Sequence, residues 1–175
     1  MDRYNFLIID PEDGQLVPFE EWSSRPDPTT AQLVVIIAEG RSKGLVIYKK
    51  HLVNPGDRKN GHFRFDEAQE AAQHFSVAMP AKAAFRCPTR LECIVDLYDA
   101  RYAGLDEVLS AIGGETFVDR TIWTCEEDPD TDPEFREFAF LFCATGADEE
   151  NGCNLANNNK ACACSVRPVS SINLK

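Results

Sequence analysis

The sequence has little positive charge and no long hydrophobic run. Its 175 residues include 18 Lys and Arg against 29 Asp and Glu, a formal net charge of −11. Such a surface repels nucleic-acid phosphates, which argues against DNA or RNA as the main partner. No apolar stretch approaches the roughly 20 residues of a membrane-spanning helix, and the N-terminus has no signal-peptide cleavage pattern. We therefore expect a soluble chain without a membrane span, made in the cytoplasm and displayed on a surface only through a partner.

Motifs of catalysis and metal binding are also missing. The chain has no glycine-rich phosphate loop and no C-x-x-C. Its seven cysteines are too sparse for a disulfide scaffold. Zinc or a disulfide at Cys162 and Cys164 stays open, because C-x-C places both sulfurs on one side of a strand. Free thiols are the favoured interpretation, and we predict no catalytic residue, no metal and no cofactor.

The remaining polar candidates have ordinary structural explanations. His74 fits a half-exposed helix residue better than a general base, and His51 and His62 flank a polar loop where we expect them to be solvated. The acidic run at 126–134 lacks EF-hand spacing, so a solvated turn is favoured over a calcium site. Arg167 is expected to have a structural role, paired with an internal carboxylate.

Local signals predict one α+β domain over residues 1–175, with strands, then helices, then strands. Residues 1–30 contain two short strands and a loop, which we interpret as an N-terminal extension. The segment QLVVIIAEGRSKGLVIYKK is the strongest hairpin signal, because two runs of β-branched residues flank a polar, glycine-containing turn. Three more strands are expected in the segments RTIWTC, REFAFLFCATG and KACACSVRPVSSI.

Helical patterns occupy the middle of the chain. A helix is expected from Asp66 to about Val77, with Asp66 as its N-cap and Gln69 three residues on. Thr89 and Glu92 form a capping box for a second helix, whose apolar spacing continues to near residue 101. A short helical stretch over 105–112 then ends at a glycine.

The order of these segments resembles the Lcl C-terminal domain family, whose members have a C-type-lectin-like fold. The segment CPTRLECIVDLYDARYAGLDEVLSAIGG is similar to the family's LPT-x-x-E helix and its following L-x-x-x-L-x-x-x-GG stretch. RTIWTCEE stands where the family has YWSSTE, and EFAFLFCATG where it has AWYVNFSNG. KACACSVRPVSSI is similar to the K-x-x-x-x-x-VRPV ending. The resemblance covers residues 6–172 and implies two main helices packed on antiparallel sheets, with long loops in the C-terminal third.

The departures from that family suggest a second resemblance. Cysteine, alanine and serine stand where the family has aromatics, Asn or Ser. This is similar to the variable proteins of diversity-generating retroelements, in which adenines near the 3′ end of the gene are replaced during reverse transcription. Changing the two adenines of an Asn codon yields Ala, Cys, Ser or Thr, and an unchanged codon leaves Asn. The resemblance implies a variable ligand-binding region over 122–168, with these candidate residues: Thr124, Cys125, Cys143, Cys153, Asn154, Asn157, Asn158, Asn159, Ala161, Cys162, Ala163, Cys164 and Ser165.

Alternation along a strand would put Cys162, Cys164 and Val166 on one face. It would put Ala161, Ala163, Ser165 and Arg167 on the other. Only one of these faces is expected to reach a ligand. The favoured hypothesis is a hypervariable display protein that binds a protein or glycan on another cell or host. Its alternatives are an ordinary Lcl-like adhesin or glycan-binding domain, an oxidoreductase like the formylglycine-generating enzyme, and a metal-stabilised module. Assembly into a homo-oligomer is compatible with the resemblance.

Overall fold

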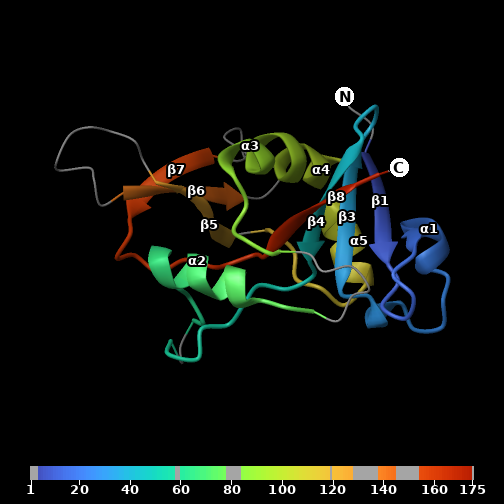
Figure 1. Cartoon of the computed structure of the whole chain (residues 1–175), viewed down its shortest axis with the longest axis horizontal. Coiled ribbons are helices and arrows are strands. Elements are labelled where there is room, and N and C mark those ends of the chain that lie inside the picture. The colour runs from blue at the N-terminus through green and yellow to red at the C-terminus, as the bar shows by residue number, and fades with distance from the viewer. Residues whose placement is uncertain are drawn as a thin grey trace.

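The computed structural model describes residues 4–57, 60–77, 84–118, 120–127, 138–144 and 154–174. In this part of the chain, two antiparallel sheets are joined by helices (Figure 1). The predicted α+β class with antiparallel sheets is confirmed. None of the helices in these residues has the length and apolar character that crossing a bilayer takes.

The first sheet has five strands in the order β2 (Leu16–Pro18), β1 (Tyr4–Ile9), β3 (Leu33–Ala38), β4 (Lys43–Tyr48) and β8 (Val169–Asn173). All neighbours pair antiparallel. The predicted hairpin is β3 and β4, and its turn includes Gly40 at φ 80°. β1 lies between β2 and β3, so the N-terminal residues are an integral part of the sheet rather than an appendage.

The second sheet has three strands in the order β5 (Arg120–Glu127), β6 (Phe138–Ala144) and β7 (Asn154–Asn159). The strands at β5 and β6 were expected from the sequence. β7 was not, because the sequence NLANNN has low intrinsic strand propensity and reads as a polar turn. Pairing along β6, from Cys143↔Asn154 to Phe138↔Asn159, overrides that propensity.

The helical elements are α1 (Phe19–Trp22), η1 (Pro28–Thr30), α2 (Phe65–His74), α3 (Arg90–Glu92), η2 (Cys93–Tyr98), α4 (Asp99–Tyr102) and α5 (Leu105–Ala111). Elements α3, η2 and α4 follow one another without a break, and η2 has π-helical hydrogen bonding. The predicted capping box is confirmed: Glu92 N donates to Thr89 Oγ1 at 3.1 Å, and Thr89 N donates to Glu92 Oε2 at 2.8 Å.

The boundaries predicted for α2 are wrong at both ends. The helix begins at Phe65, and its capping carboxylate is Glu67, which accepts from Arg64 N at 3.0 Å. It ends at His74 rather than near residue 77, because Phe75 turns away in an extended conformation. Its ring packs against Phe85 with a centroid distance of 4.9 Å. A tertiary aromatic contact therefore ends this helix, and no local stop signal announces it.

Three apolar clusters make up the core of the described residues. The largest lies between one face of the first sheet and the helical segment 93–112. The second lies between α2 and the second sheet, around Trp123 and Leu141. The third covers the other face of the first sheet, around Val35 and Phe85. The segment 164–169 links two of them, since Cys164 and Val166 belong to the second cluster and Val169 to the first.

Candidate functional site

What we call the 158–163 turn comprises the last two residues of β7 and the turn that follows, and it leads into the buried segment 164–170. It contains five of the thirteen predicted site residues. Ala161 and Ala163 are exposed, and Asn158, Asn159 and Cys162 are half-buried. The Asn159 side chain shapes the turn: its Oδ1 accepts from Ala161 N at 2.8 Å, and its carbonyl accepts from Cys162 N at 2.8 Å. Asn is favoured in such turns because its side chain bonds the backbone two residues on.

Main-chain hydrogen bonds hold both ends of the 158–163 turn against the segment before α2. Phe65 N donates to the Lys160 carbonyl at 3.1 Å, and Phe63 and Cys164 exchange two backbone bonds of 2.9 and 3.0 Å. One side-chain contact adds to these, an ion pair of 2.9 Å between Lys160 Nζ and Glu127 Oε2. The path of the turn thus depends little on the side chains at 161–163.

Three predicted ligand-binding residues are buried, which leaves them almost no surface for a ligand. Thr124 has no exposed surface, and its hydroxyl donates to the Phe140 carbonyl at 2.9 Å. Cys164 and Ser165 are 6% and 4% exposed, and Ser165 N donates to the Thr121 carbonyl at 3.0 Å. The expected alternation fails because 160–162 form a turn and the residues from 164 to 170 are buried whichever way they point.

The other predicted residues lie on the second sheet or beyond the described part. Cys125 and Cys143 are half-buried and pack, with Cys162, against the cluster beneath α2. Asn154 and Asn157 are on β7, where their backbones pair with Cys143 and Phe140. Cys153 and the acidic residues 128–134 lie outside the described residues. The structure therefore brings the 158–163 turn, Cys125 and Cys143 to one region of the second sheet.

The thiols of this region are poorly suited to nucleophilic chemistry. Burial raises the pKa of the Cys164 thiol to about 12, helped by the neighbouring Cys162 and Cys143. Burial also raises the pKa of Cys125. A reactive cysteine needs the opposite shift, because the thiolate is the nucleophile. Within the described residues these cysteines are free thiols, and no group of three or more His, Cys, Asp or Glu side chains is placed to hold a metal ion.

A buried arginine fixes the C-terminal segment in place. Arg167 is fully buried and donates from Nη1 to the Tyr48 carbonyl at 2.9 Å and from Nη2 to the Glu115 carbonyl at 2.6 Å. Its Nη2 also lies 2.9 Å from His51 Nε2, and its guanidinium stacks over the Phe117 ring at 4.5 Å. The predicted structural role fits these contacts, but the expected carboxylate partner is wrong, since carbonyls and an imidazole take its place.

His51 is buried beside this arginine, which corrects the expectation of a solvated side chain. Burial first, and then the Arg167 charge, lower the pKa of His51 to about 2. A neutral imidazole can accept from Arg167 only through a bare Nε2, so the proton sits on Nδ1. The Nδ1 atom has no hydrogen-bond partner in the described residues. Burial likewise lowers the pKa of Arg167 to about 9.

No family model matches this chain, and no curated protein sequence matches it either. The resemblance to the Lcl C-terminal domain family and to retroelement variable proteins thus stays a prediction from short motifs.

Proposed function

We propose that this chain is a ligand-binding protein with a C-type-lectin-like scaffold, on which the 158–163 turn and the adjoining second sheet carry exchangeable side chains. The observation that carries the proposal is the main-chain anchoring of the turn. Backbone bonds hold it from Phe65 to Lys160 and, at its end, between Phe63 and Cys164, while Ala161 and Ala163 are exposed. Side chains at such positions typically change stability by no more than about 0.5 kcal/mol.

The frame around the turn supports the same proposal. Binding residues are most effective on loops that a rigid scaffold positions. Here the turn leads directly into the segment 164–170, whose residues are all buried and whose Arg167 is bonded to two carbonyls. A rigid base beneath an exposed turn permits ligand contacts to vary without loss of the fold. By this proposal the ligand is a protein or glycan on another cell or host, in the manner of retroelement variable proteins.

Comparison of independent copies of the gene tests the variable part of the proposal. We expect differences to concentrate at the exposed codons of 158–163, and a reverse transcriptase gene with an adenine-rich partial copy of the 3′ end nearby. Identical residues at these codons in every copy, with neither element nearby, would contradict hypervariability. An invariant turn that still binds a glycan would favour the ordinary Lcl-like adhesin.

Direct exchange of side chains tests the physical basis. Ala163→Tyr is expected to change the free energy of unfolding by less than about 0.5 kcal/mol, or about 1–2 °C in Tm for a chain of this size. The matched control is Ser165→Tyr, two residues away, where overpacking a buried site should cost about 1–3 kcal/mol or more. Equal losses in the two variants would show that the turn is not a free display position.

Selection for binding completes the test. A library randomised at 161–163 should yield folded variants that bind a chosen target protein, because these residues reach solvent. A second library randomised at Thr124, Cys164 and Ser165 should yield mostly unfolded variants. Recovery of folded binders from the second library alone would contradict the proposal that the 158–163 turn is the ligand-binding surface.

A further inference from the structure

We propose that an open pocket between the β3–β4 turn and the helix α3–η2 binds a small carboxylate anion, with Lys43 and Ser171 as its polar contacts. The pocket has a volume of about 400 Å³. It is built by elements that the 158–163 turn does not include, so its function is separate from the proposed display surface.

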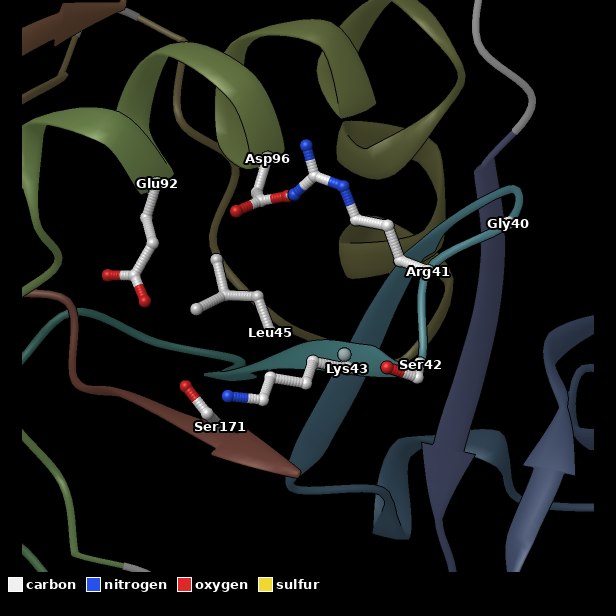
Figure 2. Close-up of a pocket in the computed structure, with 9 residues that line it drawn as sticks. Gly40, Arg41, Ser42, Lys43, Leu45, Glu92, Asp96 and Ser171 are labelled. Carbon is white, nitrogen blue, oxygen red and sulfur yellow. The ribbon is translucent and has the colours of Figure 1, made fainter. Parts of the chain in front are cut away.

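Two walls and a floor define the pocket (Figure 2). The β3–β4 turn supplies one wall, which includes Arg41 and Lys43. The opposite wall is helical and presents Glu92 and Asp96. Leu45 and Ser171 line the space between them, and in Figure 2 the Lys43 side chain extends along the floor toward Ser171.

The two carboxylates of the pocket already have cationic partners. Arg86 forms a bidentate pair with Glu92, with bonds of 2.7 and 2.6 Å. Arg41 Nη1 lies 2.9 Å from Asp96 Oδ1. Both carboxylates are therefore neutralised before any ligand arrives, and they do not form an empty cation site.

Lys43 is the one cationic residue of the pocket lining that is not paired with Glu92 or Asp96. The described residues that line the pocket carry two cations (Arg41 and Lys43) and two carboxylates (Glu92 and Asp96), and of these cations Arg41 is paired with Asp96. Among the described residues, the Lys43 side chain has no ion-pair or hydrogen-bond partner. An ammonium without a carboxylate partner at a pocket can pair with a bound anion.

The chemistry of the lining selects a monoanion with a short apolar tail. One ammonium and one hydroxyl can each donate to a carboxylate oxygen. Leu45 offers an apolar floor for the tail. A phosphate dianion would bring a second negative charge close to Glu92 and Asp96, for which no free cation is left. The carboxylate can come from a free short-chain acid or from the C-terminus of a peptide.

Titration of the ¹⁵N-labelled full chain tests the site. Butanoate should shift the backbone amide signals of Gly40, Gly44 and Ser171, while butanamide, its neutral isostere, should not. Lys43→Met keeps the alkyl stem and removes the charge, and it should weaken butanoate binding about three- to tenfold. The control is Lys50→Met, at an exposed lysine outside the pocket, which should bind butanoate like the wild type.

Further titrations separate the two carboxylate sources. Acetyl-dialanine with a free C-terminus is compared with its amide and with butanoate, and tighter binding of the peptide acid assigns the pocket to peptide termini. Tighter binding of butanoate assigns it to free acids. The proposal is overturned if neither acid shifts the pocket signals, if butanamide binds as well as butanoate, if inorganic phosphate binds more tightly, or if Lys43→Met changes nothing.

Discussion

Lowering the pH from 8 to 5 should destabilise the protein through His51. The pKa of this histidine falls from 6.5 in the unfolded chain to about 2 in the fold, first because of burial and then because of Arg167. Above pH 6.5 both states are neutral and the group has no effect. Below pH 6.5, His51 is protonated in the unfolded chain but stays neutral in the folded protein. The free energy of unfolding therefore decreases as the pH falls toward 2.

The size of the loss follows from the same two values. Each pH unit well below the unfolded pKa costs about 1.4 kcal/mol per proton. At pH 5 the free energy of unfolding should be about 2 kcal/mol lower than at pH 8, which is about 4–8 °C in Tm. The assay is urea unfolding followed by circular dichroism at pH 8, 7, 6 and 5.

The variant His51→Gln removes the titration and keeps an acceptor for Arg167. Its unfolding free energy should depend much less on pH between 8 and 5, whatever its absolute value. Carboxyl groups such as Asp96, whose pKa burial raises, cancel in the difference between wild type and variant. The control is His74→Gln, at a side chain that is 77% exposed. Equal slopes for wild type and His51→Gln would refute the assignment of the pH dependence to this buried pair.

Three further predictions concern the helix cap, the hairpin and the thiols. Thr89→Ala should lower Tm by about 2–4 °C through loss of about 1 kcal/mol of capping, while Thr89→Ser should restore most of it; equal values in thermal unfolding would contradict the cap. Gly44→Ala would place a Cβ atom 2.6 Å from Val35 Cγ1, so urea unfolding should show a loss of about 1–3 kcal/mol, and an unchanged midpoint would be evidence against this close packing. Iodoacetamide should modify the half-exposed Cys162 well before the buried Cys164, whose pKa is about 12; equal rates by peptide mapping would argue that the segment opens readily.

Features with a local signal were predictable from the sequence. The hairpin of β3 and β4 follows from two runs of β-branched residues around a turn, and both strands are largely buried. The capping box at Thr89 depends on residues only three apart and forms as expected. Both features depend on residues close together in the sequence, so their local patterns were sufficient to predict them.

Features that depend on distant partners were not predictable. Strand β7 is polar and forms because β6 offers a complete ladder of backbone partners. The burial of His51 depends on Arg167, which is 116 residues away in the sequence. Neither residue has a pattern around it that distinguishes a buried polar pair from a solvated one. The VRPV motif at residues 166–169 indicated a structural segment. It did not indicate which groups Arg167 would contact.

Near the end of the predicted variable region, exposure gives way to burial at one peptide bond, between Ala163 and Cys164. Replacement of adenines acts on the gene and takes no account of burial. Random changes at the codon for Ser165 would often place a large side chain where only 4% of the serine is exposed. Such copies would be lost through misfolding, because overpacking costs about 1–3 kcal/mol or more. A retroelement that diversifies this protein efficiently should therefore have adenines in its template opposite the exposed codons of 158–163 and few opposite 164–170. The boundary in the template would then coincide with the boundary of burial in the fold.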